Sequence, residues 1–498
     1  MELQFNKTVC PCLQKVISKP QSQELTQELR LPDTMPDIGR ILGCWGQILI
    51  RGKEWRTGGM TVSGGVMVWV LYAPEDGSQP QSLDAWIPFQ MKWEFPETQR
   101  DGFIRICPYL KAMDCRSLSA RKMMIRSGVS MMGEALEPVD VDIWHPDSVP
   151  EDVQLLKQTY PMDLPQEAGE KPFLLEEELV LPGNLPQMQK LVRCEIQPRI
   201  SEHKVMAGKL VFRGACGMHL LYASDDGEFH TWDFEMPFSQ FADLDRDYGP
   251  NASAEIDAVV TGFEQDRDAE GKVLLKCGVS AQYVVCDRCM IDVVEDAYSN
   301  IRSVKQHQEL LRLPVRLDIR RDEISVNQNI NTEGQKIVDI AAFWDCPVLR
   351  QSGSTAEAEM NGQFQTLLIS ESGTMQNASS QKKENWSMDS DPENQIFMKL
   401  VPGNPKSGFG PEGAQISMTL SMETAVFSQQ GIPMITSLEL GEVAEPDPMR
   451  PSLIVRRCND CTLWELAKTC GSTVEAICAA NQLQQEPLGD RMLLIPVI

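Results

Sequence analysis

The chain repeats itself at a spacing of 150 residues. When the sequence is shifted by that distance, residues 28–77 align with residues 178–227 without a gap. Fifteen of these positions are identical, where ordinary composition gives about 3. A chain with such a repeat folds as consecutive copies of one module, so the repeat limits the architecture more than any other feature of the sequence.

Within each copy, apolar residues recur at every second position, which predicts a half-buried β-strand. Each run leads into an Asp-Gly pair, at 76–77 and 226–227, where glycine accepts the positive φ of a hairpin turn. The returning segment contains a proline, which is typical of an edge strand. We therefore predict a two-layered antiparallel module. The apolar face consists of Met60, Val62, Val66, Val68, Val70 and Tyr72 in the first copy and of Leu210, Phe212, Cys216, Met218, Leu220 and Tyr222 in the second.

A third, more divergent copy begins at residues 309–314 and continues through 362–368 to a Ser-Gly turn at 372–373. Its last strand is the alternating run 416–422. The predicted fold class is therefore mostly β, with three repeated antiparallel modules of sandwich type followed by a small β-α-α-β domain.

The predicted bounds follow from composition and turn signals. Residues 137–171 are acidic and contain prolines, which indicates a linker, and residues 376–394 are polar without periodicity, which indicates a surface loop. The predicted modules are 1–136, 172–300 and 301–445, and the last domain is 451–498.

The last domain has the signals of two short helices between two strands. Thr462 and Glu465 have the spacing of a capping box, and Gly471 suits a left-handed helix end. The same spacing returns at 472–475 and starts a second helix that ends near Asn481. Strands are predicted before and after this pair of helices.

This domain resembles a LysM domain through residues 462–464, 471–477, 480–483 and 493–496. The repeated modules look like SPOCS domains, which precede LysM in spore-envelope assembly proteins of the SipL and SpoVID type. The resemblance implies a cytoplasmic protein of the mother cell in a clostridial spore former. It also implies action at the forespore surface together with a SpoIVA-like spore coat ATPase.

In the LysM family, N-acetylated glycan such as peptidoglycan lies in a shallow groove between two loops. Carried over by position, the resemblance implies that the ligand-binding groove consists of Asn459, Asp460, Thr462 and Leu463 on one side and of Ala480, Asn481, Gln482 and Leu483 on the other.

Two observations leave a second interpretation of the groove open. The family usually has a glycine before the first helix, but this chain has Cys458-Asn459-Asp460-Cys461 there. In addition, Thr462 and Asn481 could serve only as helix caps.

The chain has 46 basic and 71 acidic side chains, which gives a formal charge of −25. This charge repels nucleic acid and anionic membrane surfaces. No window has the roughly 18 apolar residues of a membrane span, and residues 1–7 have no basic stretch before an apolar run. We therefore expect no nucleic-acid partner, no membrane span and no export signal.

Fifteen cysteines, an odd number, lie mostly in apolar runs and are predicted to be reduced thiols. The Cys-x-x-Cys pairs Cys286/Cys289 and Cys458/Cys461 lie far apart in sequence, so we predict packed thiols and no metal site.

The chain lacks the usual nucleotide-binding, metalloprotease and serine-hydrolase motifs. We therefore predict no enzymatic activity and no cofactor. The predicted function is a scaffold in endospore envelope assembly that binds proteins through its modules and a partner or glycan through the last domain. The alternative is a cell-wall protein that binds peptidoglycan directly through the last domain.

Overall fold

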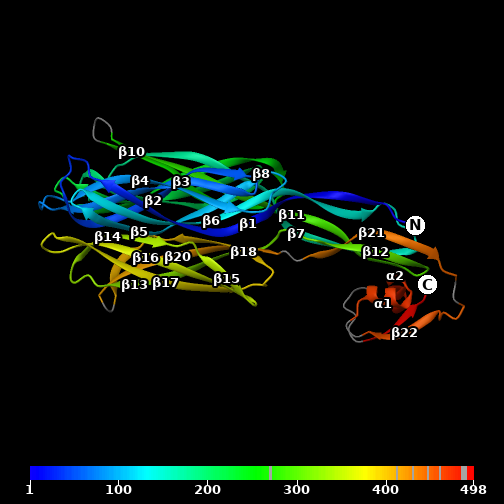
Figure 1. Ribbon diagram of the computed structural model, residues 1–498. Coiled ribbons are helices and arrows are strands. Elements are labelled where there is room, and N and C mark those ends of the chain that lie inside the picture. Colours follow the sequence, from blue (N-terminus) through cyan, green and yellow to red (C-terminus); the bar gives the residue numbers. More distant parts are fainter. Residues whose placement is uncertain (268–271, 411–412, 429–430, 446–447, 459–460, 484–490) are drawn as a thin grey trace.

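The computed structural model describes the chain except residues 268–271, 411–412, 429–430, 446–447, 459–460 and 484–490. Antiparallel strands make up most of the molecule, and two short helices lie near its C-terminal end (Figure 1). The prediction of a mostly β chain is therefore confirmed.

The first module is a sandwich of two three-stranded sheets with the strand orders β2-β3-β4 and β1-β6-β5. Buried side chains from both sheets, such as Val66 on β3 and Met131 on β6, belong to one hydrophobic core. The strands are β1 (Phe5–Arg30), β2 (Ile38–Arg56), β3 (Gly59–Pro74), β4 (Gln81–Glu94), β5 (Phe103–Ser119) and β6 (Lys122–Pro146).

The second module repeats this plan, although its counterparts of β2 and β3 form one long element, β8. Halfway along β8, the chain turns at Ala207, whose φ is 49°, where the first module turns at Gly58. Ser201 precedes this turn and Arg213 follows it, and the Ser201 hydroxyl donates to the Arg213 carbonyl at 3.1 Å, so the two halves of β8 lie side by side. The strands are β7 (Val153–Glu178), β8 (Met188–Ser224), β9 (Phe229–Tyr248), β10 (Ser253–Arg267) and β11 (Val273–Ser299).

The repeat extends to individual contacts. The Tyr72 hydroxyl donates to the carbonyl of Pro36 at 2.9 Å, and the Tyr222 hydroxyl donates to the carbonyl of Pro186 at 3.2 Å. The two donor residues are 150 positions apart in the sequence, and so are the two acceptor residues. Predicted strands 60–77 and 210–227 are therefore equivalent, as expected from their shared apolar face.

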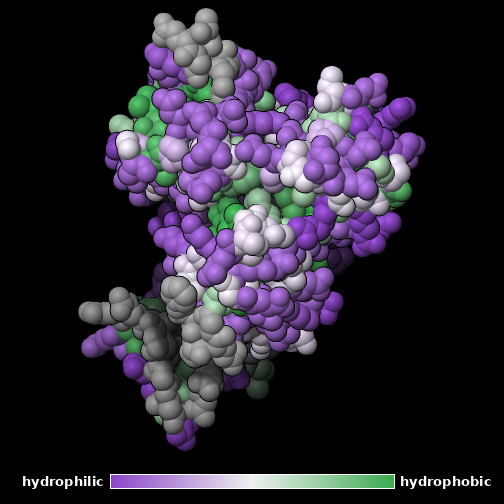
Figure 2. All heavy atoms as spheres, turned by 90° about the vertical axis from the view of Figure 1, so that its left-hand side faces the viewer, coloured by the Kyte–Doolittle hydropathy of each residue, from purple (hydrophilic) through white to green (hydrophobic). Residues whose placement is uncertain are grey.

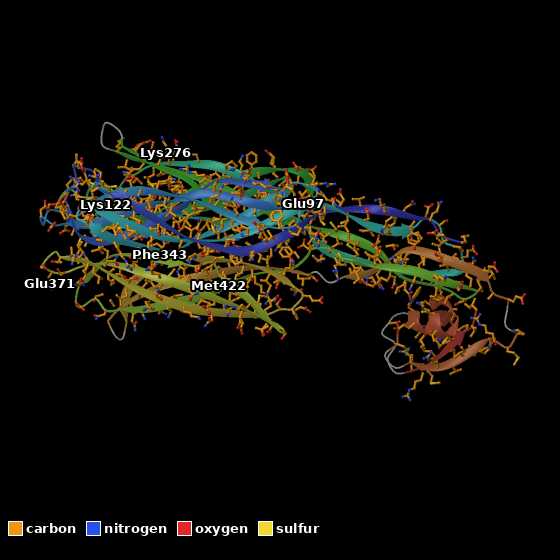
Figure 3. All side chains as sticks on the ribbon, in the orientation of Figure 1. Glu97, Lys122, Lys276, Phe343, Glu371 and Met422 are labelled. Carbon is orange, nitrogen blue, oxygen red and sulfur yellow. A yellow bond between two sulfur atoms is a disulfide. The ribbon has the colours of Figure 1, made fainter. Side chains whose placement is uncertain are left out.

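The third module keeps the hairpin of the other two. Its turn glycine, Gly373, has a φ of 80°, against 77° at Gly77 and 81° at Gly227. The strands are β12 (Arg302–Leu311), β13 (Val315–Ile330), β14 (Lys336–Trp344), β15 (Val348–Ser352), β16 (Thr355–Ile369), β17 (Met375–Asp389), β18 (Gln395–Pro402), β19 (Lys406–Gly410), β20 (Gly413–Ser428) and β21 (Ile432–Val443). Met422 on β20, labelled in Figure 3, lies in the core of this module.

The predicted surface loop 376–394 is wrong, because most of it is strand β17. This strand pairs with β16 from Met375 opposite Ile369 to Asp389 opposite Thr355. Its middle positions alternate between exposed and half-buried side chains, but nearly all of them are polar. The sequence therefore has no hydrophobic periodicity that would indicate a strand here, and the pairing with β16 decides the conformation.

The long strand pairs extend beyond the sandwiches into a stalk, seen on the right of Figure 1. We define the stalk as residues 1–15, 137–165, 286–313 and 432–443. Three antiparallel pairs form it, β1 with β6, β7 with β11, and β12 with β21. Their apolar side chains share one core, which contains Cys12, Ile143, Leu164, Ile291, Leu311 and Met434.

The predicted linker 137–171 is also wrong, because β6 and β7 occupy most of it. The acidic residue Asp140 is exposed, while Ile143 and Leu164 point into the stalk core. Strands with one solvated face can be acidic overall, so composition alone misleads here. The outer bounds of the modules stay predictions.

The C-terminal unit (residues 451–498) has the predicted β-α-α-β order. It consists of β22 (Leu453–Cys458), α1 (Leu463–Cys470), α2 (Val474–Asn481) and β23 (Arg491–Pro496), with β22 antiparallel to β23. Leu466, Ile477 and Ile495 are fully or nearly fully buried in its core. The unit lies at the tip of the stalk (Figure 1).

Two surface features bear on function. No helix among the described residues has the length and apolar character needed to cross a membrane. The end of the molecule away from the stalk is mostly hydrophilic (Figure 2), in keeping with the charge of −25.

Candidate functional site: the C-terminal unit and the body that holds it

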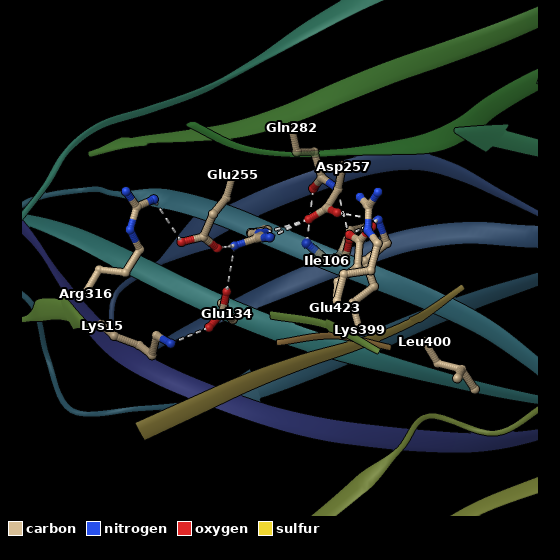
Figure 4. Close-up of polar contacts among 12 residues, drawn as sticks. Lys15, Ile106, Glu134, Glu255, Asp257, Gln282, Arg316, Lys399, Leu400 and Glu423 are labelled. Carbon is tan, nitrogen blue, oxygen red and sulfur yellow. Dashed lines mark hydrogen bonds and ion pairs between the residues drawn. The ribbon is translucent and has the colours of Figure 1, made fainter. Parts of the chain in front are cut away.

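A buried network of charges joins the three modules (Figure 4). Arg105 on β5 donates to Asp257 on β10 through Nε at 2.8 Å and Nη2 at 2.6 Å, and through Nη1 to Glu255 at 2.8 Å. Lys399 on β18, which belongs to the third module, forms an ion pair with Asp257. Strands β5 and β10 pair with β6 and β11, which continue into the stalk, and β18 pairs with β20.

The network stays ionised inside the protein. Burial opposes ionisation of Asp257, but Arg105 and Lys399 outweigh it and hold the pKa of this carboxyl well below its usual range. Removal of either cation would leave the buried Asp257 carboxylate with less compensation. The network therefore holds the modules in one fixed arrangement, and each of its carboxylates already has a cationic partner.

A second polar junction joins the second and third modules. Asp339 on β14 accepts from Arg193 at 2.6 Å and contacts His219 at 2.7 Å. The other ring nitrogen of His219 contacts Asp233 at 2.6 Å. Burial opposes protonation of His219, but the hydrogen bonds with Asp233 and Asp339 outweigh it and raise its pKa to about 9.

The C-terminal unit contacts the tip of the stalk through α1. The indole N–H of Trp464 donates to Asp296 at 2.7 Å, and the Lys468 ammonium donates to the same carboxylate at 2.7 Å. The rings of Trp464 and Tyr298 meet edge to face, with centroids 4.8 Å apart. The Tyr298 hydroxyl also donates to the carbonyl of Ser472 at 3.0 Å.

The local sequence explains why α1 presents these groups. Thr462 caps the helix, since its hydroxyl accepts from the amide of Glu465 at 3.2 Å and the Glu465 carboxylate accepts from the Thr462 amide at 3.2 Å. Trp464 and Lys468 are four residues apart and therefore lie on the same side of α1. Gly471, with a φ of 68°, ends the helix and lets the chain turn at the stalk.

Asp296 is the centre of this contact. Burial opposes its ionisation, but hydrogen bonds from Lys468, Trp464 and Gln306 outweigh that effect and lower its pKa. Sequence reasoning missed Asp296 and Tyr298 because they lie on β11, far in sequence from their partners. No local pattern links the two segments.

The predicted groove residues are only partly brought together. Leu463 is buried in the core of the C-terminal unit, so its side chain faces away from solvent. Thr462, Ala480 and Gln482 are exposed, and Leu483 is half-buried. Asn459 and Asp460 lie outside the described residues.

Two polar groove residues hold the C-terminal unit together. Thr462 is the cap of α1, and Asn481 links α2 to β23. The Asn481 amide donates to the carbonyls of Ile477 at 2.8 Å and Leu494 at 2.6 Å, and its oxygen accepts from the Leu494 amide at 2.8 Å. Both residues thus act in folding, and a glycan-binding groove stays a prediction.

The prediction of packed thiols is wrong for Cys458 and Cys461, which form a disulfide between the end of β22 and the start of α1. Their Cα atoms are 5.8 Å apart, inside the range that a disulfide can bridge. Cys286 and Cys289 are free, and Cys286 is buried in β11. Within the described part of the chain, no three His, Cys, Asp or Glu side chains are grouped so as to hold a metal ion.

Comparison with known proteins adds one match. The family model described as SipL, SPOCS domain matches residues 187–266, which include β8, β9 and nearly all of β10. No curated protein and no solved structure matches the chain. The second module is therefore similar to the SPOCS domain of SipL, and this similarity indicates a sporulation-related role in protein interaction.

Proposed function

We propose that the protein is a non-enzymatic scaffold in endospore envelope assembly, which uses a rigid body to present its C-terminal unit to a protein partner. One observation carries this proposal: α1 of the C-terminal unit is fixed to the stalk through Asp296, with Trp464 and Lys468 both bound to that carboxylate. The similarity of residues 187–266 to the SipL SPOCS domain supports the connection with sporulation.

The body suits such a role because its parts are fixed relative to one another. The buried charges around Arg105 join the three modules, and the stalk core contains side chains from all three strand pairs. A binding unit at the tip of this body is displayed at a set distance and orientation. By resemblance, the partner is a SpoIVA-like spore coat ATPase, and the site of action is the mother-cell cytoplasm at the forespore surface.

Truncation tests the proposal. The full chain and a chain that ends at Pro451 are each mixed with the purified SpoIVA-like ATPase, and co-purification is measured. We expect the full chain to bind and the truncated chain to lose binding. Circular dichroism must show that the truncated chain keeps its strand content, and binding of that folded truncated chain at full strength would contradict the proposal.

The alternative function, direct binding to peptidoglycan, has its own test. Substitution of Asn481 is unsuitable because its side chain holds α2 to β23. Gln482 is exposed and has a φ of 54°, a conformation that glycine adopts readily, so Gln482→Gly removes a groove side chain without harm to the fold. Sedimentation of the full chain with peptidoglycan, reduced in Gln482→Gly, would favour the wall-binding alternative.

A further inference from the structure

The disulfide between Cys458 and Cys461 sets these two residues apart from the other cysteines of the chain. The remaining thirteen are free thiols, and most of them are buried. Cys458 lies at the end of β22 and is only 1% exposed. Cys461 is half-buried and lies directly before Thr462, the cap of α1. The two residues of the disulfide therefore differ in their access to solvent.

A disulfide is unusual in the compartment proposed above. In a reducing cytoplasm disulfides are rare, and those that form are usually transient, with a catalytic or redox-sensing role. The thirteen free thiols of the chain match such a compartment. A purely structural role also gains less here than elsewhere, because the disulfide joins residues only three positions apart and so closes a short loop. Reversible exchange therefore explains this disulfide better than permanent cross-linking.

The fold accommodates the reduced pair as well as the disulfide. The Sγ of Cys458 lies 3.2 Å from the carbonyl oxygen of Cys461, so this oxygen is a ready acceptor for the thiol of reduced Cys458. A buried Cys458 thiol is thus left with a hydrogen-bond partner. Cys461 lies at the N-terminal end of α1, where the helix amides stabilise a negative charge and hence a thiolate. Cys461 is therefore suited to be the reactive sulfur of the pair.

We propose that Cys461 is a site of reversible thiol–disulfide exchange with a low-molecular-weight thiol, and that Cys458 is the resolving thiol. The proposal combines the disulfide itself, the difference in access between the two residues, and the acceptor that awaits the Cys458 thiol. It rests on the proposed function only for the cytoplasmic compartment. The exchange chemistry of the pair needs no protein partner.

Reduction of the disulfide takes two steps. A small thiolate attacks the Sγ of Cys461 and forms a mixed disulfide, while the bond to Cys458 breaks and its electron pair goes to the Cys458 sulfur, which takes up a proton. A second small thiolate attacks the small-molecule sulfur of the mixed disulfide, which releases Cys461 as a thiolate together with a small disulfide. Two small thiols are thus oxidised for each protein disulfide reduced. The reverse sequence, with the small disulfide as oxidant, restores the bond.

The exchange acts on the helix that contacts the stalk. The disulfide ties the end of β22 to the start of α1. Trp464, the third residue after Cys461, and Lys468 both donate to Asp296 on the stalk. Reduction removes the covalent link between β22 and this helix. We therefore expect the C-terminal unit to be held less firmly on the stalk when the pair is reduced.

The first test uses the full chain in buffers with graded ratios of reduced to oxidised glutathione. Alkylation of free thiols and peptide mass spectrometry measure each cysteine separately. We expect the pair to pass from disulfide to dithiol as the ratio rises, while buried thiols such as Cys216 stay free throughout. A pair that stays a disulfide in a large excess of reduced glutathione is structural, and a pair that never forms a disulfide is two packed thiols. Either result overturns the inference.

Single substitutions separate the roles of the two sulfurs. In oxidised glutathione, Cys458→Ser should carry one glutathione on Cys461, found by peptide mapping, whereas Cys461→Ser should leave the buried Cys458 unmodified. Cys478→Ser, at a half-buried position of the same unit, is the matched control and should behave like the wild type. Equal modification of Cys458 and Cys461 in the two variants would contradict the assigned roles. If a variant does not fold, the titration of the wild type still decides.

Amide exchange around Tyr298 tests the consequence for the stalk. Exchange there should become faster when the wild type is reduced, and it should not respond to reductant in Cys461→Ser, which has no disulfide. Unchanged exchange in fully reduced wild type would contradict the link between the pair and the stalk contact. None of these measurements uses the ATPase, so a failure of partner binding would overturn the scaffold function and not this inference.

Discussion

Trp464 and Tyr298 meet edge to face, with ring centroids 4.8 Å apart, across the boundary between the C-terminal unit and the stalk. Both rings also have a polar contact that fixes their orientation, Trp464 to Asp296 and Tyr298 to Ser472. An aromatic pair with hydrogen bonds at both ends is more specific than apolar contact alone. The C-terminal unit is thus held in one orientation relative to the body.

We expect Trp464→Ala to release the C-terminal unit from the stalk without unfolding either part. The change removes the ring pair and a hydrogen bond to a charged group, together about 2 to 4 kcal/mol of the contact free energy. Small-angle X-ray scattering should show a larger maximum dimension, and amide exchange near Tyr298 should become faster. Ala480→Gln, at an exposed position of α2, is the control, and an unchanged scattering profile of Trp464→Ala would contradict the assigned contact.

Arg105→Ala should destabilise the whole body. Its guanidinium pairs with Asp257 and Glu255 in the interior, and its loss leaves these carboxylates with less compensation. Such a change costs about 3 to 5 kcal/mol, visible as a lower midpoint in chemical unfolding. The matched control is Arg56→Ala, which removes an exposed ion pair with Glu54 and should leave the midpoint unchanged. Equal midpoints for the two variants would mean that the buried network does not hold the modules together.

The sandwiches could be predicted from the sequence because their strands have one buried face. Val62 and Phe212 sit 150 residues apart on the same side of equivalent strands, and both are almost fully buried. Alternation of this kind is a local signal, and the repeat gives it twice. The Asp-Gly turns add a second local signal, borne out by the positive φ of Gly77 and Gly227.

The parts that sequence reasoning missed depend on pairing between distant segments. Strand β17 is polar at most positions and exists because β16 pairs with it along its whole length. In the sequence, the stalk strands near Asp140 look like an acidic linker. Only the structure shows that their apolar side faces the other two strand pairs. Asp296 shows no motif, and its role appears only where Trp464 and Lys468 reach it.

The junction at His219 should make stability depend on pH. The pKa of His219 is raised from 6.5 to about 9 by Asp233 and Asp339, against the effect of burial. A raised histidine pKa stabilises the fold fully below about pH 6.5, and this stabilisation is lost as the pH rises towards 9. The shift corresponds to about 3 kcal/mol at most.

Urea unfolding at pH 6, 7.5 and 9.5 measures this dependence. We expect the wild type to lose stability across the series and His219→Gln to lose much less. The control is His307→Gln, because the side chain of His307 is 71% exposed and its ring lies 4.0 Å from the Glu309 carboxylate. If the pH profiles of wild type and His219→Gln are parallel, the junction at Asp339 does not have the assigned protonation state.

The disulfide between Cys458 and Cys461 gives the last prediction. Among the described residues it is the one disulfide, and the other thirteen cysteines are free thiols. Protein purified without reductant and then unfolded should therefore react with thirteen equivalents of a thiol reagent, and with fifteen after reduction. Because four residues lie within the loop that it closes, chain entropy predicts a stabilisation of about 2 kcal/mol.

That stabilisation should act on α1, since the disulfide ties the end of β22 to the start of this helix. Reduction should speed amide exchange over residues 463–470 and leave the exchange in β3 and β8 unchanged. Cys461→Ala removes the disulfide, so its exchange should not respond to reductant. Fifteen reactive thiols before reduction, or one equivalent of zinc by elemental analysis, would mean that Cys458 and Cys461 are not disulfide-bonded in the folded protein, and that the start of α1 is held by its Thr462 cap alone.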